Sequence, residues 1–452
     1  MTPKTLLVKN ADILITMDEQ RREILGGGLY VEDNRIVAVG PAETLPAVAD
    51  DVIDMQGHVV LPGLANTHHH MFQSLTRALP AAQDTSLFGW LKALYPVWAR
   101  LTPEMIRVST QTAMAELLLS GCTTSSDHLY LFPNGARLDD SIEGAAEIGM
   151  RFHAARGAMS IGESQGGLPP DALVEPEAHV LSDTARLIET FHDPAPRSML
   201  RIVVAPCSPF SVSRELMRDT AVLARQYGVS LHTHLAENRE DVAYSLERYG
   251  RTPARYAEDL GWLGPDVWHA HCVQLDGEGI GLFGASKTGV AHCPCSNMRL
   301  GSGTAPIRRM RREGVPVGIG VDGSASNDAA HMLSEIRQAM LLQRVAFGPD
   351  AMTGREALEL GTLGGAQVLR RDDIGAVAVG MAADLAVFDL NGIAFAGAWR
   401  DPVAALAFCG PTSAAYTIVG GRVVVREGRL TTIDLPALIR THNRLAAQLI
   451  DG

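Results

Sequence analysis

The sequence predicts an α/β protein, a (β/α)8 TIM-type barrel with a small β-sandwich built from both chain ends. Eight apolar, strand-like runs alternate with amphipathic, helix-like runs between residues 61 and 371, and this alternation is typical of a parallel barrel. Polar residues gather at the ends of those runs, where such barrels hold their active sites. Residues 1–60 and 372–452 instead carry Val- and Ile-rich runs separated by Gly and Asp or Asn, which indicates antiparallel strands.

The predicted elements follow in chain order. The N-terminal sandwich strands lie in TLLVKNADILITM, GGLYVEDNRIVAVG and DDVIDMQGHVVLPG. The barrel strands lie in VLPGLANTHHH, CTTSSDHL, RFHAARGAM, LRIVVAPCS, VSLHTHLAE, VWHAHC, GVAHCPCS and VPVGIGVDG, with helical runs such as PEMIRVSTQTAMAELLLSG between them. The C-terminal sandwich strands lie in IGAVAVGMAADLAVFDL and AAYTIVGGRVVVREGRL, and LPALIRTHNRLAAQLI closes the chain as a helix. We expect a barrel domain at 61–371 and a sandwich domain at 1–60 and 372–452, which includes this helix.

Composition narrows the class of protein and its partners. The chain has 452 residues, is 46% hydrophobic and carries a net charge of −12, so binding to nucleic acid, which needs a basic face, is not expected. No apolar run reaches the roughly 18 residues that a membrane helix needs, and the N-terminus has no signal-peptide pattern. The six cysteines form no disulfide framework. These features predict a cytoplasmic protein with a small-molecule partner and no membrane partner.

Three histidines close the first predicted barrel strand. Because side chains alternate faces along a strand, His68 and His70 point to one side and His69 to the other. Two imidazoles on one face suit a borderline-soft metal ion. The alternative is a run of solvent-exposed loop histidines.

Three further predicted strand ends carry groups of the same kind. The fifth strand brings His234 to the barrel mouth, and Glu237 follows just beyond the strand. The sixth ends at His271, and the eighth places Asp322 at the rim. A lone histidine or aspartate is more often a structural residue, but four strand ends that all carry metal-type ligands favour a metal-dependent enzyme.

The stretches PGLANTHHH, HTHLAE, HAH and GIGVDGSASND resemble the signatures of the amidohydrolase superfamily, in its cytosine/guanine deaminase-like branch. SLFGWLKALYPVWARLTPE, LLLSGCTTSSDHLYLFP, APCSPFSV and HCPCSNMRL are similar to the bacterial 8-oxoguanine deaminases within that branch. The resemblance covers nearly the whole chain. It implies His68, His70, His234 and Asp322 as metal ligands, with Glu237, His271 and Asp322 as catalytic residues.

The resemblance also implies one divalent metal, because the fourth strand end, APCS, has no lysine to bridge a second. Zn²⁺ is the default and Fe²⁺ also suits three nitrogens and a carboxylate. Such a metal lowers the pKa of bound water to roughly 7. Asp322 would take the proton of the water, Glu237 would protonate the ring nitrogen, and His271 would hold the attacking oxygen.

The reaction so implied is hydrolytic deamination of a free oxidised purine, 8-oxoguanine and water giving urate and ammonia. Related aminohydrolases that act on guanine, isoxanthopterin, a hydroxytriazine or an adenosine derivative are alternatives. A barrel that binds a ligand without catalysis is a more remote one, because it would have little reason to keep Glu237. Barrels of this type often pair, so a homo-oligomer is expected.

Candidate substrate-binding residues sit near the same strand ends. Gln73 offers both donor and acceptor to a heterocycle edge, unless it only begins a helix. Trp90, Tyr95 and Trp98 could stack on a flat ring or belong to the core. Guanine deaminases usually carry an arginine before the phenylalanine of the fourth-strand loop, and Pro209 stands here instead, which argues against guanine. The remaining candidates at the rim are His128, Tyr130, Arg156, Cys207 and Ser208.

Overall fold

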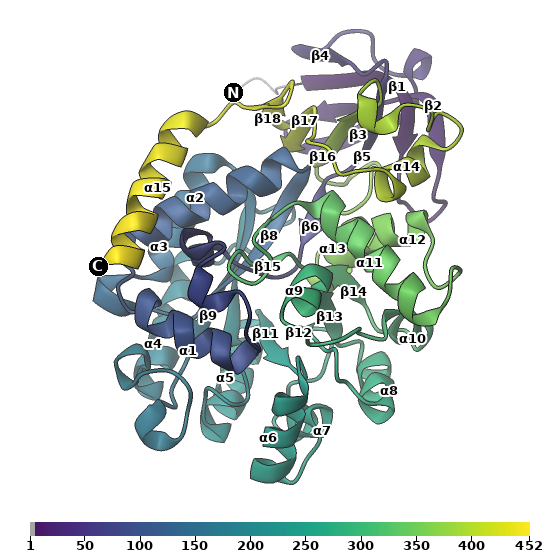
Figure 1. Ribbon diagram of the computed structural model, residues 1–452. Helices are drawn as coiled ribbons and strands as arrows, with labels where there is room; N and C mark the ends of the chain where they lie inside the picture. The colour runs from purple at the N-terminus through teal and green to yellow at the C-terminus, as the bar shows by residue number, and fades with distance from the viewer. Residues whose placement is uncertain (1–4) are drawn as a thin grey trace.

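The computed structural model describes residues 5–452. Its central feature is a closed barrel of eight parallel strands, so the predicted barrel is confirmed (Figure 1). Each barrel strand lies in its predicted run, and the ring closes where Ile319 pairs with Asn66. In chain order the strands are β6 (Leu64–Asn66), β8 (Cys122–Leu129), β9 (Arg151–Ala158), β10 (Leu200–Pro206), β11 (Ser230–Leu235), β12 (Val267–His271), β13 (Gly289–His292) and β14 (Val317–Ile319).

A short second ladder lies at the barrel mouth. β7 (His69–His70) pairs in parallel with β15 (Asp322–Gly323), so that Asp322 faces His69 and Gly323 faces His70. This pairing joins the chain just beyond the first strand to the chain just beyond the eighth. It therefore brings two of the predicted ligand-bearing segments together.

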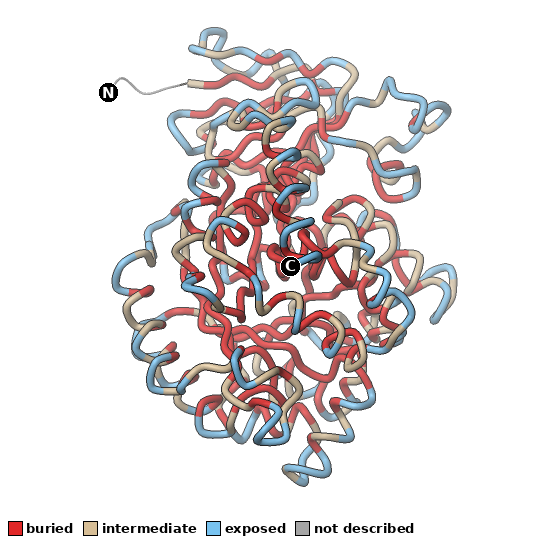
Figure 2. Tube along the Cα trace, turned by 60° about the vertical axis from the view of Figure 1, so that its left-hand side comes forward, coloured by how far each residue is buried: buried red, intermediate tan, exposed pale blue. Residues whose placement is uncertain are grey.

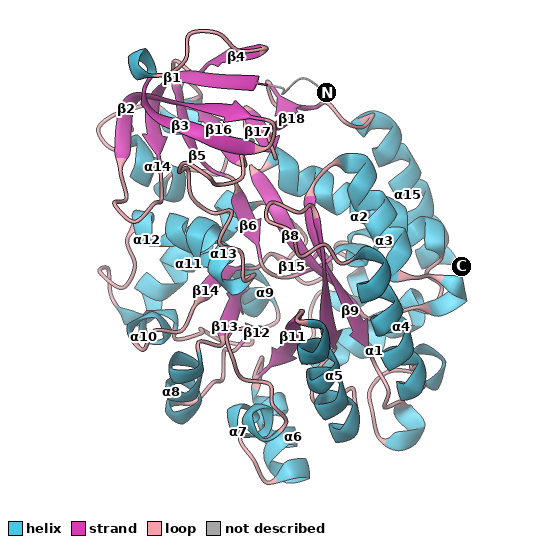
Figure 3. Ribbon diagram, turned by 180° about the vertical axis from the view of Figure 1, so that it is seen from behind, coloured by secondary structure: helices cyan, strands magenta, loops and turns pink. Residues whose placement is uncertain are grey.

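Helices surround the barrel (Figure 3). Their ends follow the local sequence: Thr102 caps α2 by accepting from the Met105 N–H, and Gly228 ends α5 in a left-handed conformation. The helices between the barrel strands and after them are α1 (Leu87–Trp98), α2 (Pro103–Leu119), α3 (Leu138–Ile148), α4 (Glu177–Phe191), α5 (Arg214–Tyr227), α6 (Arg239–Tyr249), α7 (Pro253–Asp259), α8 (Gly277–Ser286), α9 (Pro294–Arg299), α10 (Ile307–Arg312), α11 (Met332–Phe347), α12 (Gly354–Glu359) and α13 (Gly365–Val368). A 3-10 helix, η2 (Met71–Thr76), follows β7.

The two chain ends build one β unit, as predicted. Its strands form one continuous nine-stranded sheet, in which the N-terminal and C-terminal parts meet where β5 pairs antiparallel with β16. Buried residues from both parts, among them Leu6, Val31, Val60 and Leu385, form one apolar cluster. The strands are β1 (Thr5–Ile15), β2 (Glu23–Glu32), β3 (Arg35–Pro41), β4 (Asp51–Asp54), β5 (His58–Pro62), β16 (Leu385–Asp389), β17 (Tyr416–Val419), β18 (Arg422–Arg426) and β19 (Arg429–Leu430).

The predicted closing helix is α15 (Leu435–Asp451), which follows α14 (Pro402–Phe408). It packs against α2 and η2 beside the barrel rather than on the sheet (Figure 1). The Arg100 guanidinium donates to the Leu449 carbonyl over 2.9 Å, and the His442 Nε2 lies 3.0 Å from the Ser74 Oγ. The helix thus supports the segment that carries Gln73.

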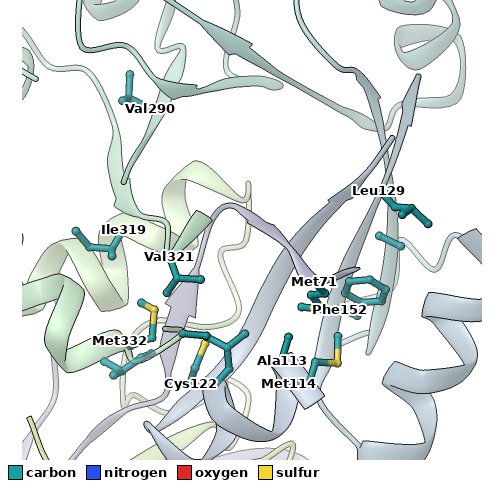
Figure 4. Packing of buried hydrophobic residues seen from close by; sticks show 14 of the residues in the cluster. Met71, Ala113, Met114, Cys122, Leu129, Phe152, Val290, Ile319, Val321 and Met332 are labelled. Carbon is teal, nitrogen blue, oxygen red and sulfur yellow. The ribbon is translucent and has the colours of Figure 1, made fainter. Parts of the chain in front are cut away.

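The main core lies between the barrel strands and the surrounding helices (Figure 2). Met71, Leu129 and Phe152 belong to it together with Ala113 and Met114 of α2 (Figure 4). Trp90, Tyr95 and Trp98 also belong to this core and are at most 3% exposed. Among the described residues, no helix is both long and apolar enough to cross a membrane.

Candidate metal centre and active site

The predicted metal ligands meet at the carboxyl ends of the barrel strands. His68 and His70 follow β6, His234 lies in β11, and Asp322 begins β15. All four are at most 9% exposed. The His70 Nε2 lies 3.0 Å from the His234 Nε2, and the Asp322 Oδ1 lies 3.2 Å from the His68 Nε2 and 3.4 Å from the His70 Nε2.

Backbone acceptors fix the tautomers of two of these imidazoles. The His70 Nδ1–H donates to the His128 carbonyl over 2.7 Å, and the His234 Nδ1–H donates to the Cys207 carbonyl over 2.6 Å. A carbonyl oxygen only accepts, so the proton of each neutral ring sits on Nδ1. Both Nε2 atoms therefore present a lone pair to the shared space. Two lone pairs that face each other need a cation between them.

A relay fixes the third imidazole in the same way. The His232 Nδ1–H donates to the Trp268 carbonyl over 3.1 Å, which leaves the His232 Nε2 as an acceptor. The His68 Nδ1–H donates to that nitrogen over 2.8 Å. The His68 Nε2 is then unprotonated, and it is buried without a hydrogen-bond partner in the described chain. Such outer hydrogen bonds are what orient histidines around metals.

These atoms fit a divalent metal. Three imidazole nitrogens and one carboxylate oxygen are the donors that zinc and related ions prefer. Two such ligands with 2.1 Å bonds at the tetrahedral angle lie about 3.4 Å apart, close to the separations of the ligand atoms here. Burial lowers the pKa of His68, His70 and His234, that of His234 to about 3, so the rings stay neutral and able to bind a metal.

Asp322 remains ionised despite its burial. Burial alone would raise its pKa, but His271 holds that pKa well below its usual value. Its Oδ2 accepts a hydrogen bond from the Ser326 hydroxyl over 3.2 Å and lies 3.8 Å from the His271 Nε2. One oxygen of the carboxylate therefore faces the ligand nitrogens and the other faces the pocket.

Glu237 and His271 lie together beside this centre. The Glu237 Oε2 is 3.6 Å from the His271 Nε2. Burial raises the pKa of Glu237 to about 8, so this carboxyl can hold a proton at neutral pH. Burial would lower the pKa of His271, but Glu237 and Asp322 raise it above its ordinary value. The His271 Nδ1–H donates to the Asn297 Oδ1 over 2.9 Å, so its Nε2 faces both carboxylates.

A pocket opens onto these residues, and its empty space, including the part open to solvent, is about 430 Å3. Of the predicted substrate-binding residues it includes Gln73, Tyr130, Cys207 and Ser208. The other lining residues are His70, Leu87, Trp90, Leu91, Tyr95, Phe210, His234, Glu237, His271, Leu300, Asp322 and Ser326. Flat apolar walls and a few convergent polar groups suit a planar heterocycle.

Gln73 has an unused donor in this pocket. Its Oε1 accepts from the Ala325 N–H over 3.4 Å. Its Nε2 is buried and has no hydrogen-bond partner in the described chain. A buried amide nitrogen without an acceptor is costly, and a ring carbonyl or ring nitrogen of a substrate would satisfy it.

Two predicted substrate-binding residues lie elsewhere. Arg156 is 2% exposed and faces the helices, where its guanidinium pairs with Glu175 at 2.8 Å and with Asp183 at 3.3 Å. His128 lies among the metal-type histidines: its Nε2–H donates to the Ala205 carbonyl over 2.7 Å, and its Nδ1 has no partner in the described chain. Neither residue lines the pocket.

The structure also adds residues that the sequence did not single out. Asn297 orients His271, and Ser326 contacts Asp322. Both lie within stretches on which the family resemblance rests, HCPCSNMRL and VDGSASND. These motifs therefore pointed to the two positions, although an asparagine or a serine alone would not have done so. Leu87, Leu91 and Leu300 line the pocket and have no pattern that separates them from core leucines.

Comparisons with known proteins agree with this geometry. A family model described as the amidohydrolase family matches residues 59–424. The chain is 47% identical to 8-oxoguanine deaminase of Pseudomonas aeruginosa, over 94% of this chain and 95% of that protein. It is 38% identical to hydroxydechloroatrazine ethylaminohydrolase of Pseudomonas sp., over 97% and 94%. The crystal structure of atrazine chlorohydrolase from Arthrobacter aurescens, complexed with zinc, is similar with a TM-score of 0.94 and 35% identity, covering 98% of this chain and 100% of that one.

Proposed function

This chain belongs to the amidohydrolase family, and we propose that it deaminates a free oxidised purine, converting 8-oxoguanine and water to urate and ammonia. The observation that carries the proposal is the 47% identity to 8-oxoguanine deaminase over nearly the full length of both chains. The site supports it, because a proton acceptor, a proton donor and a planar pocket lie around one candidate metal centre. The enzyme acts on the C–N bond of a cyclic amidine.

In this proposal His68, His70, His234 and Asp322 hold one divalent metal ion per chain. Three nitrogens and a carboxylate make Zn²⁺ the default occupant, and Fe²⁺ would also suit them. When bound, the ion lowers the pKa of water at the site toward roughly 7. The protein supplies the remaining chemistry through groups that hold and move protons.

Asp322 accepts the proton of the attacking water, because its carboxylate stays ionised in the presence of His271. Glu237, whose pKa burial raises to about 8, donates a proton to the ring nitrogen beside the reacting carbon. Negative charge then does not build up on that nitrogen. The oxygen of the water bonds to the carbon, and the exocyclic amine takes the proton from Asp322. The C–N bond then breaks and ammonia leaves, while the proton that remains on the new oxygen returns to Glu237 as the carbonyl forms.

His271 and the pocket walls position the reactants. The His271 Nε2 faces both carboxylates, at 3.6 Å from Glu237 and 3.8 Å from Asp322, and it can hold the attacking oxygen. Gln73 would bind the six-membered ring through its unpaired Nε2–H. Tyr130, Cys207 and Ser208 are the remaining polar groups that we propose to contact the purine.

The test is a comparison of substrates with the metal-replete full-length protein. Ammonia and urate are measured with 8-oxoguanine, guanine and isoxanthopterin, and Glu237→Gln protein serves as the control for contaminating activity. We expect 8-oxoguanine to have the highest kcat/KM, by as much as ~10⁴-fold over guanine, because a site that hydrogen-bonds a group rejects the analogue without it. If guanine or isoxanthopterin is faster by tenfold or more, the substrate assignment is wrong and the aminohydrolase assignment stands. If none releases ammonia, the proposed function is wrong.

A further inference from the structure

A second and larger cavity lies at the opposite end of the barrel from the metal centre. It opens at the N-terminal ends of β10 and β11, beside the segment that leads from α13 toward the sheet. Its empty space, including the part open to solvent, is about 1470 Å3. The proposed deamination uses none of its residues.

Arg201, at the start of β10, is an uncompensated cation in this cavity. Its Nη1–H donates to the Arg370 carbonyl over 3.2 Å, and its Nε is buried without a hydrogen-bond partner in residues 5–452. No carboxylate of the described chain lies within ion-pair distance of it. Burial and the charge of Arg371 lower the pKa of Arg201 to about 10. A half-buried guanidinium without a counter-charge is costly, so a ligand that supplies one is favoured.

The neighbouring cations differ from Arg201 in having partners. Arg371 is bound by Asp373 at 2.7 Å, and Arg151 by Asp384 at 2.9 Å, in pairs that are buried. Asp373 and Asp372 lie near enough to raise the pKa of Arg201, but Asp373 is already paired with Arg371. Among the described residues that line the cavity, Asp372 is the one carboxylate beside Arg201, Arg370 and Arg371, and it is exposed.

The two histidines of the cavity also present donors. The His192 Nδ1 accepts from the Ile202 N–H over 3.1 Å, so its proton sits on Nε2. The His153 Nε2 accepts from the Arg371 Nη1 over 3.5 Å, so its proton sits on Nδ1. Burial and nearby arginines lower the pKa of both, which keeps them neutral. Arg370 itself is held in the left-handed region at φ 55°, a conformation that non-glycine residues adopt at a cost.

We propose that this cavity binds a small organic anion whose phosphate or carboxylate group pairs with Arg201. Guanidinium groups match such oxyanions in geometry and charge, and they only donate. The wall also has an apolar part that would receive the body of the ligand, formed by Ile202, Val203, Val229, Ile374 and Met381. The site is separate from the metal centre and stands whether or not the proposed deamination is correct.

The test measures binding of three probes to the full-length protein by calorimetry and by the shift in Tm. The probes are phenyl phosphate, inorganic phosphate and benzoate. We expect phenyl phosphate to bind more tightly than inorganic phosphate, because only it has an apolar body. Arg201→Gln should weaken phenyl phosphate binding about tenfold or more, as the loss of a charge-assisted hydrogen bond implies. Benzoate distinguishes a carboxylate site from a phosphate site.

Arg218→Gln is the matched control, because Arg218 lies exposed in α5 and, among the described residues, forms an ion pair with its neighbour Asp219 alone. It removes the same charge and should leave binding unchanged. Arg201→Gln without ligand should be at least as stable as the wild type, since it removes a desolvated cation. The proposal is wrong if no probe raises Tm at millimolar concentration, or if both variants weaken binding equally. Ammonia release should be unchanged in Arg201→Gln.

Discussion

Replacing Gly323 with alanine should damage catalysis while leaving the fold and the metal site intact. Gly323 directly follows Asp322 and pairs with His70 across the mouth. A Cβ at this position would lie 1.8 Å from the Gln73 Oε1 and 2.4 Å from its Cδ. Because real Cβ contacts essentially never fall below 3.0 Å, the amide of Gln73 must move by about 1.2 Å, the difference between the two distances.

The cost of Gly323→Ala to stability should be small. Gly323 is not in the left-handed region, so alanine adopts its backbone conformation without strain. The atom that it meets is the end of a flexible side chain, which places the overpacking cost near 1 kcal/mol. The lower conformational entropy of the unfolded alanine chain offsets roughly 0.4–1 kcal/mol of that. We therefore expect Tm to change by only a few degrees.

The cost to catalysis should be much larger, because Gln73 is proposed to hold the reacting ring. A misplacement of about 1 Å can reduce the rate by ~10²-fold, and we expect kcat/KM for ammonia release to fall by this order. Metal content per chain, measured by elemental analysis, should stay as in the wild type. Gly281→Ala on α8 is the matched control, because its Cβ would meet only the Glu313 Oε2, at 3.8 Å.

A double-mutant cycle decides whether the collision with Gln73 is the cause. In a Gln73→Ala background the amide is gone, so Gly323→Ala should cost little further activity. If Gly323→Ala costs the same factor in both backgrounds, the reasoning is refuted. Loss of metal from the single variant would also refute it, since the damage would then pass through Asp322.

Three further predictions concern the centre itself. His70→Ala should empty the metal site and abolish turnover, because it removes one of the lone pairs that face the ion; two metals per active wild-type chain would contradict the single-ion proposal. Glu237→Gln should keep its metal and lose ~10²–10⁴-fold in kcat, the usual contribution of positioned proton transfer; a near-native rate would remove Glu237 from the mechanism. The kcat of the wild type should fall as pH rises through about 8, because burial raises the pKa of Glu237 to that value and only its protonated form can donate; a pH profile that stays flat to 9.5 would contradict this role.

The barrel and its family were predictable because local patterns specify them. Each barrel strand is an apolar run, and metal-type residues stand where four of them end. The family comparison confirms the resemblance, over residues 59–424. β5 pairs with β16, and this pairing makes the end segments one sheet. It could not be predicted from local patterns, because the sequence of a strand does not determine which other strand it pairs with.

The position of Arg156 shows why the substrate residues were harder to predict. β9 is buried along its whole length on both faces, so its sequence has no alternation to mark the inward side. Phe152 and Ala158, which share the parity of Arg156, belong to the core under the helices. The partners of Arg156, Glu175 and Asp183, lie 19 and 27 residues further along the chain, and no local pattern connects them.

His271 shows the opposite case, in which strict alternation would give the wrong face. In β12 the inward residue Trp268 packs with Ala205 and Ala291 inside the barrel, whereas the outward His269 bonds to the Trp262 carbonyl. By parity His271 should face outward with His269. It enters the pocket instead, because its own φ is +71°. Asp322, at +60°, is also in this sparsely populated region. His271 and Asp322, which face the pocket beside Glu237, therefore hold a backbone conformation that costs free energy.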